Sequence, residues 1–152
     1  MSSVIELVEF ALDGRRYGLL LSTVARVVRM VDVTPLPKAP EIVLGVINVR
    51  GQVIPVVNIR RRFRLPEREP TLSDHIVIAR TTRRTAALIT DSVAGVFECL
   101  EREVVPSQAI APGIQYVAGV VKLSDGMVLV HDLDRFLSLD EEQGLDEALA
   151  NA

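Results

Sequence analysis

The sequence predicts an all-β protein built from two small closed barrels that pack together. Branched apolar residues dominate the composition, with 23 Val and 10 Ile among 152 residues, and such side chains suit pleated, half-buried strands. Short runs of these residues alternate with turn residues. The order of runs and turns then recurs in the second half, and self-similarity at a fixed period indicates repeated structural units.

The first hairpin of the chain is predicted by its turn. Residues 8–12 and 17–21 are β-like runs that flank an Asp-Gly pair in the segment 13–16, and this pair is a strong hairpin signal. Ser22 then begins a short helical turn, and another strand runs toward Val33.

A second hairpin follows a proline-rich loop. Three prolines fall within residues 34–40, which marks this segment as a loop. The apolar runs 46–49 and 53–57 then flank the turn Arg50-Gly51-Gln52. Residues 65–73, LPEREPTLS, form the linker candidate because they are polar and contain two prolines.

After the linker, the pattern of the first half recurs. Residues 76–90 repeat the first hairpin, and Val93-Ala94-Gly95-Val96 repeats Val24-Ala25-Arg26-Val27, both at an offset of 68 to 69 residues. The stretch 119–132 repeats 45–58 at an offset of 74, with a turn glycine between the two strands of each.

Two repeats of this size predict two five-stranded units within one domain. We place the domain at residues 5–138, with subdomain 1 at about 10–64 and subdomain 2 at about 75–137, and their ends can cross over. Units this small bury little apolar surface alone, so we expect them to share a hydrophobic core. Residues 139–152 are acidic, and we expect a solvated tail that is a frayed helix or disordered.

Composition and charge exclude several classes of protein. The net charge of −3 gives no basic field for nucleic acid or anionic lipid. The single cysteine, Cys99, cannot form an internal disulfide, which fits a reducing compartment. The N-terminal residues resemble no secretory signal, and no uncharged apolar run is long enough to span a bilayer. We therefore expect a soluble, cytoplasmic protein without membrane insertion.

The residues that could perform chemistry are few and scattered. His75 and His131 lack the spacing of a zinc site, and we interpret both as surface or strand-end residues. Asp132 and Asp134 begin like a calcium loop, but Phe136 stands where an oxygen ligand belongs. Phosphate-binding and nucleophile motifs are absent from the sequence. We therefore predict no catalytic residue, no metal site and no cofactor.

One basic cluster raises a nucleic-acid hypothesis. Residues 59–64 read IRRRFR, and arginines around an aromatic ring can contact phosphates and stack on a base. Acidic residues follow at Glu67 and Glu69, and the total charge is negative. This reading stays a minor alternative.

The stretch 45–63, GVINVRGQVIPVVNIRRRF, closely resembles the signature of the CheW family. The resemblance extends over residues 5–138 through FALDGRRYGLLLSTVARVV before the signature and YVAGVVKLSDGMVLVHDLDRFL after it. The positions that match the signature are Gly45, Val46, Asn48, Arg50, Gly51, Pro55, Val56, Val57 and Phe63.

The resemblance implies two SH3-like five-stranded barrels on a common core and a non-catalytic role. Proteins of this family couple chemoreceptors, the methyl-accepting chemotaxis proteins, to the histidine kinase CheA in membrane-associated arrays. The implied partners are therefore the regulatory domain of CheA and the cytoplasmic tip of a chemoreceptor. An adaptor of a parallel pathway that controls pili, development or second-messenger output stays open.

The resemblance also implies the residues of a receptor-binding groove. The receptor-facing segments of the family fall on Leu21, Val24 and Arg26, with Val93 and Val96 across the groove. The family commonly has an acidic residue at the position of Arg26, and reversing that charge can change which receptor is bound.

The signature turn is implied to have a structural or coupling role. It consists of Asn48, Arg50 and Gly51. We expect Arg50 to organise the hairpin next to the groove, because a guanidinium can donate to turn carbonyls or to a carboxylate. Asn58 replaces the usual aspartate of the family and keeps a side chain that can cap a helix.

Overall fold

The computed structural model describes residues 3–106 and 117–151. The strands are β1 (Val4–Leu12), β2 (Arg15–Leu20), β3 (Val24–Arg29), β4 (Val43–Val49), β5 (Gln52–Val57), β6 (His75–Arg80), β7 (Thr85–Thr90), β8 (Ser92–Leu100), β9 (Val104–Pro106), β10 (Val117–Leu123) and β11 (Gly126–His131). The helical elements are the 3-10 turns η1 (Leu21–Thr23), η2 (Glu101–Glu103) and η3 (Leu133–Arg135), and the helices α1 (Ile59–Arg62) and α3 (Leu139–Ala150).

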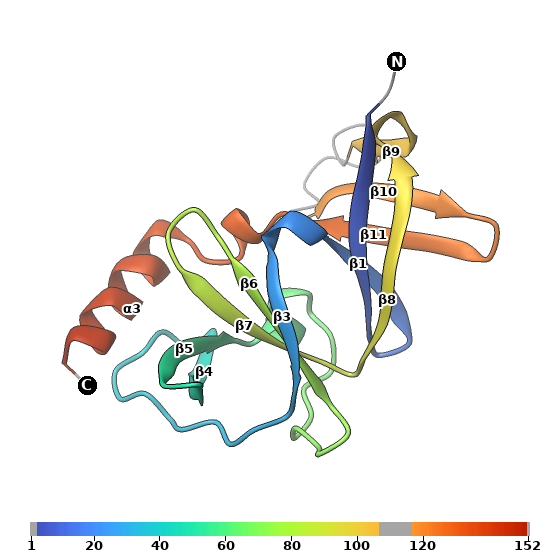
Figure 1. Ribbon diagram of the computed structural model, residues 1–152. Helices are drawn as coiled ribbons and strands as arrows, with labels where there is room; N and C mark the ends of the chain where they lie inside the picture. The colour runs from blue at the N-terminus through green and yellow to red at the C-terminus, as the bar shows by residue number, and fades with distance from the viewer. Residues whose placement is uncertain (1–2, 107–116, 152) are drawn as a thin grey trace.

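These strands form two small sheets, as Figure 1 shows. The first sheet has six strands in the order β8-β1-β2-β11-β10-β9, and the second has five in the order β3-β6-β7-β5-β4. The predicted fold class, mostly β with two small units on a shared core, is confirmed. The helical turn expected from Ser22 is limited to η1, and Val24 already begins a strand.

The two sequence repeats exchange their first hairpins. The hairpin β1–β2 belongs to the first repeat but joins the sheet of β8 to β11, while β6–β7 joins the sheet of β3, β4 and β5. Each exchanged hairpin is joined on both sides. One side is a parallel pair, with Leu129 opposite Tyr17 and Val56 opposite Ala87, and the other is an antiparallel pair, β1 with β8 and β6 with β3. The ranges 10–64 and 75–137 therefore follow the sequence repeats, whereas each sheet draws strands from both.

β-Bulges recur at equivalent positions of the two repeats. Ala25 in β3 and Ala94 in β8 are each the extra residue where the pairing register shifts, and Leu44 in β4 has the same role. A bulge adds one residue to a strand and increases its local twist. The duplication read from the sequence is thus visible in the irregularities of the strands as well as in their order.

Two glycines at matched repeat positions allow close approach of another segment. A Cβ on Gly45 would lie 2.2 Å from the carbonyl oxygen of Thr34, and one on Gly119 would lie 2.7 Å from that of Val105. In each repeat, therefore, a crossing segment packs directly on the backbone, where only glycine fits.

The turn chemistry explains why the hairpins close where they do. Asp13 and Gly14 both have positive φ, and so do Arg50 and Gly51. Two consecutive positive φ values define the type I′ turn, whose twist matches that of the flanking strands. Asn48 supports the second turn, because its side-chain oxygen accepts a hydrogen bond from the Gly51 amide at 2.9 Å.

The hydrophobic core has three parts that follow the alternation of the strands. One part lies inside the six-stranded sheet and contains Leu7, Cys99, Val121 and Val130. A second lies inside the five-stranded sheet and contains Ile47, Ile54, Val56, Ile76, Ile78 and Ala87. We name the third part, between the sheets, the shared core. Its buried members from the sheet strands are Phe10, Leu12, Tyr17, Leu19, Val43, Val57, Val77, Ala79, Ala86 and Leu88.

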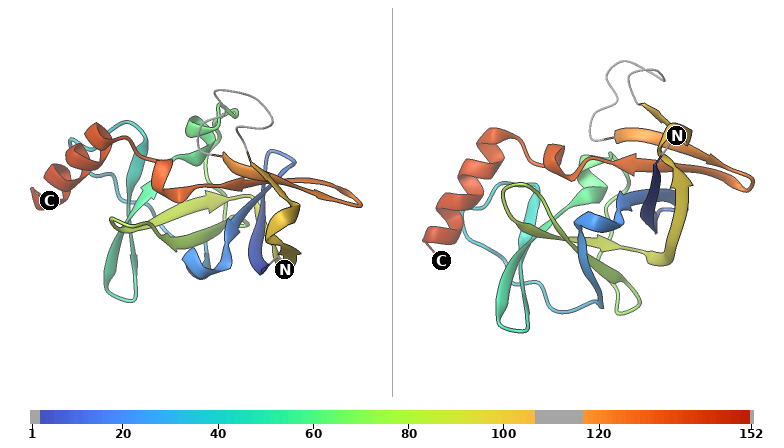
Figure 2. Two further views of the ribbon diagram at one scale, coloured as in Figure 1. Left: turned by 90° about the horizontal axis from the view of Figure 1, so that it is seen from above. Right: turned by 45° about the horizontal axis from the view of Figure 1, so that its top comes forward.

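The acidic C-terminal segment is an ordered helix, so the predicted solvated tail was wrong. Helix α3 begins with a capping box between Ser138 and Glu141, and Leu145 is fully buried in the shared core. Arg84 donates to Glu142 at 2.9 Å and to Asp146 at 2.5 Å. The acidic residues that suggested solvation are in part ion-pair partners. In Figures 1 and 2, α3 lies at the end of the molecule opposite the β10–β11 hairpin.

Candidate functional site: an apolar strip on two edge strands

Two edge strands border the shared core and hold most of the predicted receptor-contact residues. In the described sheets β3 pairs only with β6, and β8 pairs only with β1. In Figure 1, β3 lies on one side of β1 and β8 on the other. Val24 and Arg26 lie on β3, Val93 and Val96 lie on β8, and Leu21 lies in η1 before β3.

The β3 side of this surface consists of Val24 and Val27. Val24 lies opposite Ala79 and Val27 opposite Val77, and both partners belong to the shared core. Cross-strand partners project from the same face of a sheet, so both valines face the border of that core. Val27 is 39% exposed because β3 has no further neighbouring strand to cover it. Sequence reasoning did not assign Val27 to the site, because residues three apart lie on opposite faces of a regular strand. The bulge at Ala25 brings Val24 and Val27 to the same face.

The β8 side consists of Val93 and Val96. Val93 lies opposite Phe10 and packs partly against the shared core, and Val96 lies opposite Val8. Val8 and Phe10 alternate on the same face of β1, so the two valines of β8 share a face as well. Val96 is 53% exposed. We name Val24, Val27, Val93 and Val96 the apolar strip.

The two strands of the strip run in opposite directions past the shared core. β3 begins after Leu20 and η1. Leu20 and Phe97 lie opposite the same residue of β1, one on each side of this strand, and Phe97 is near the end of β8. The start of β3 therefore lies toward the end of β8. β3 ends at Arg29. Arg29 and Thr90 lie opposite the same residue of β6, one on each side of this strand. Since β8 starts two residues after Thr90, the end of β3 lies toward the start of β8.

Arg26 does not share the face of the strip. It lies opposite Ile78, whose side chain is in the interior of the five-stranded sheet, whereas Val24 and Val27 lie opposite residues of the shared core. The bulge at Ala25 produces this change, because it adds one residue between Val24 and Arg26. Arg26 is exposed at the sheet edge.

The turn Asn48–Gly51 lies away from the strip, which corrects the role expected of Arg50. The turn joins β4 to β5, and β4 is the edge of its sheet opposite to β3. The guanidinium of Arg50 is exposed and forms no hydrogen bond or ion pair with the residues that the structure describes. Asn48 supplies the side-chain support of the turn, and the Arg50 side chain is left available to a partner.

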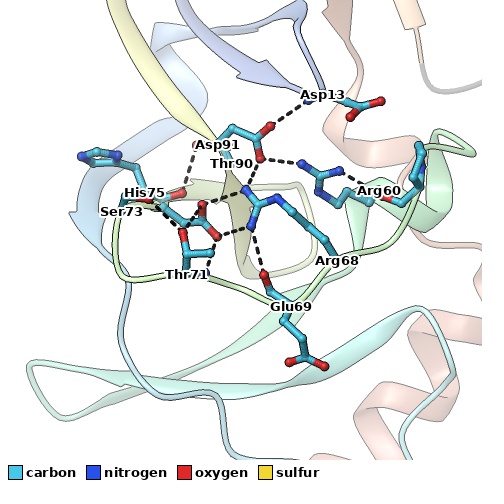
Figure 3. A network of polar contacts seen from close by, with 11 residues as sticks. Asp13, Arg60, Arg68, Glu69, Thr71, Ser73, His75, Thr90 and Asp91 are labelled. Atoms are coloured by element: carbon cyan, nitrogen blue, oxygen red, sulfur yellow. Dashed lines mark hydrogen bonds and ion pairs between the residues drawn. The ribbon is translucent and has the colours of Figure 1, made fainter.

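A polar clamp fixes the crossing from one sheet to the other at Asp91, between β7 and β8. Figure 3 shows its carboxylate between Asp13 and two guanidinium groups. It accepts a hydrogen bond from the Asp13 backbone amide at 2.8 Å and from Arg60 at 2.5 Å, and it also pairs with Arg68. Partial burial raises the pKa of Asp91, but these hydrogen bonds outweigh it and hold the pKa below its usual value.

Asp74 extends the clamp to the linker. It is 2% exposed and accepts two hydrogen bonds from Arg68, at 2.8 and 3.0 Å, and one from the Thr71 amide at 2.9 Å. Burial raises the pKa of Asp74, and the bonds from Arg68 and Thr71 lower it further than burial raises it. The clamp therefore joins the β1–β2 turn, α1, the linker and the start of β8, and it sets where the chain leaves the five-stranded sheet after β7.

The arginines of the IRRRFR cluster serve this architecture. Arg60 is in the clamp, Arg61 pairs with Glu41 at 3.1 Å, and Arg62 donates to both oxygens of Glu141 at 2.7 Å. Asn58 caps α1 by accepting from the Arg61 amide at 3.2 Å, as expected. Because three of the four arginines have intramolecular carboxylate partners, the cluster does not present a free phosphate-binding patch.

Of the two readings expected for His131, surface or strand end, the structure supports the strand end, and its side chain is buried. It ends β11, is 5% exposed, and stacks on Phe63 with ring centroids 4.0 Å apart. Tyr17 and Phe136 complete this aromatic cluster at 5.0 and 5.8 Å from the His131 ring. Tyr17, Phe63 and the pair His131 and Phe136 come from three distant parts of the sequence, so no local pattern could reveal the whole cluster.

No reactive constellation occurs in the described part of the chain. A cleft of about 430 Å³ lies beside the clamp, but Arg60, Arg68 and Asp74, which line it, are bonded to each other or to Asp91. No group of three or more His, Cys, Asp or Glu residues in this part could hold a metal ion. No helix within residues 3–106 and 117–151 is long and apolar enough to cross a membrane.

Apolar side chains are exposed on two sheet edges, while many of the charges are paired internally and the crossing between the sheets is held by the clamp. These features are typical of the class of proteins that bind other proteins through their surface. The family comparison agrees with this class. The chain matches the CheW-like domain over residues 6–141, and it therefore belongs to this family. The family is one of non-catalytic chemotaxis scaffolds, so the chain is a signal-transduction scaffold and not an enzyme.

Individual relatives cover nearly the whole chain. Chemotaxis protein CheW of Treponema pallidum is 31% identical over 146 residues, which is 92% of this chain and 86% of the relative. Chemotaxis protein CheW of Rhizobium meliloti is 29% identical over 140 residues, 91% of this chain and 90% of the relative. The crystal structure of scaffolding protein TtCheW from Thermoanaerobacter tengcongensis matches with a TM-score of 0.82 and 30% identity, covering 93% of this chain and 96% of that chain.

Proposed function

We propose that this chain couples the cytoplasmic tip of a chemoreceptor to the histidine kinase CheA, binding the receptor through the apolar strip. The observation that carries this proposal is the strip itself. Val24, Val27, Val93 and Val96 come from segments about 70 residues apart in sequence, yet all four face the border of one core. Leu21, in the turn before β3, extends this surface.

A receptor tip is a helical hairpin, and an amphipathic helix can lay its apolar face on such a surface. The strip offers four branched side chains with little conformational entropy to lose on binding. Arg26 projects from the other face of β3, so we propose that it contacts a flanking part of the receptor and tunes which receptor is bound. Contact through Arg26 is also compatible with a receptor of a parallel pathway.

Simultaneous binding of receptor and kinase requires a second surface. Each sheet draws strands from both sequence repeats, so we propose that residues 5–138 act as one rigid connector that can hold two partners at once. We further propose that the protein works in the cytoplasm and is recruited to receptor arrays at the membrane through these contacts.

The test is a pull-down of the full chain with a receptor-tip fragment and with the isolated CheA regulatory domain. Val96→Asp places a charge in the strip and should abolish receptor capture while kinase capture persists. The matched control is Val53→Asp, because Val53 is 58% exposed on β5, outside the strip, and should leave receptor capture unchanged. Failure of the folded parent protein to bind either fragment would defeat the proposal.

A further inference from the structure

The two ends of the apolar strip carry opposite charges. Arg29, at the end of β3, lies opposite His75, and by alternation from Val27 it projects toward the face of the strip. Glu98, near the end of β8, lies opposite Glu6 and alternates in the same way from Val96. All of these side chains except that of His75 are exposed, and His75 is half-buried.

These charges are not neutralised within the described residues. Arg29, Glu6 and Glu98 form no hydrogen bond or ion pair there through their side chains, whereas most of the arginines around the shared core are paired with carboxylates. Glu6 and Glu98 are directly opposite each other, and like charges in this position destabilise a sheet. A cation from outside the chain would relieve that repulsion.

The opposite directions of β3 and β8 separate the two charges. The end of β3 lies toward the start of β8, so Arg29 lies at the Val93 end of the strip and Glu98 at the other end. Because Ala94 is an extra, bulged residue, β8 advances from Val93 to Glu98 only as far as β1 does over the four residues from Phe10 to Glu6, about 13 Å at ~3.3 Å per residue. An α-helix covers that length in about 8 residues, a little more than two turns.

We propose that the strip binds an amphipathic helix in one direction, selected by an acidic residue at the Arg29 end and a basic residue at the Glu6–Glu98 end. The two charged residues of the helix are a little more than two turns apart, with its apolar face on the valines between them. Under the proposed function, on which this inference rests, the helix belongs to the receptor tip. The valines supply contact area, and the charges fix orientation, because charge complementarity determines register more than affinity.

The test uses two synthetic amphipathic helical peptides with one apolar stripe and a nitroxide label at the N-terminus. One carries Glu near its N-terminus and Lys about 8 residues later, and the other carries the two in reverse order. Paramagnetic broadening of the amide signals of the full protein then reports where the N-terminus of each peptide lies. We expect the label near Arg29 for the first peptide and near Glu98 for the second.

The double variant Arg29→Glu with Glu98→Lys should invert both placements without changing the net charge. The control pair Lys122→Glu with Glu69→Lys changes exposed charges outside the strip and should leave both placements as they are. A neutral peptide with Gln at both positions should bind about tenfold more weakly, as expected for two rim ion pairs.

If both charged peptides place the label at the same end, the direction is set by apolar contacts and the inference is overturned, while docking on the strip stands. If none of the peptides broadens or shifts the signals of the strip, docking there fails as well, and the proposed function fails with it. A preserved amide spectrum of each variant shows that the fold is intact, so neither outcome can be attributed to unfolding.

Discussion

Replacing Asp91 by Asn should weaken the clamp without changing the shape of the side chain. The carboxylate accepts from the Asp13 amide, Arg60 and Arg68, and the amide of Asn can accept fewer of these bonds. Hydrogen bonds to a charged group contribute about 1.5–3 kcal/mol each when buried. Since the Asp91 side chain is 28% exposed, we take the lower part of that range and expect a total loss of about 2–3 kcal/mol. For a chain of this size, Tm should fall by about 4–12 °C.

The effect of Asp91→Asn should depend on pH. The pKa of Asp91 is held below its usual value in the folded protein, so its ionised form contributes stability above the unfolded pKa of about 3.9. This contribution disappears as pH falls through the still lower folded pKa. In urea titrations, the difference between parent and variant should therefore be full at neutral pH and shrink in solutions more acidic than about pH 4.

The control is Asp125→Asn, because Asp125 also pairs with an arginine, Arg16, but is 73% exposed. This variant should unfold like the parent, since exposed ion pairs contribute little. Equal stability of parent and Asp91→Asn at neutral pH, or a difference that does not change with pH, would show that the clamp does not hold the crossing between the sheets.

Further substitutions test three separate parts of the structure. Gly119→Ala should lower the free energy of unfolding by about 1–3 kcal/mol, because the new Cβ would overlap a backbone carbonyl of the neighbouring strand β9. An unchanged urea midpoint would show that β9 can move away. Leu145→Ala in α3 should cost about 2–5 kcal/mol, whereas Leu139→Ala, at a position 70% exposed, should change the thermal midpoint little. Asn48→Ala should lower the free energy of unfolding by about 0.5–1.5 kcal/mol, because it removes one hydrogen bond of the turn. Arg50→Ala should leave the stability unchanged and weaken receptor-dependent kinase activation. Normal activation by a folded Arg50→Ala protein would show that Arg50 does not contact a partner.

The local features of the fold could be predicted because they depend on neighbouring residues. Asp13-Gly14 and Arg50-Gly51 fit the positive φ values of type I′ turns, and the hairpins follow from them. Val24, Val93 and Val96 were proposed as receptor contacts through the resemblance to the family, and they lie on edge strands beside the shared core.

The remaining features depend on contacts between distant residues. Nothing in the alternation of β1 indicates whether it pairs within its own repeat or with β8, since both repeats have the same pattern. The acidic composition of α3 concealed the packing of this helix on the shared core, because Arg84, which neutralises Glu142, is 58 residues away. The bulge at Ala25 shifted Arg26 to the other face of β3, and no single-sequence pattern predicts a one-residue bulge.

The exchange of hairpins between the repeats has a consequence for biosynthesis. Gly18 pairs with Val130, which is 112 residues later in the chain, so the six-stranded sheet cannot close until almost all of the protein has left the ribosome. Such long-range pairing slows folding, because distant segments must meet before their contacts can form. Until then, the edges of β1 and β2 are open to other chains, and the newly made protein should depend on chaperones during this interval.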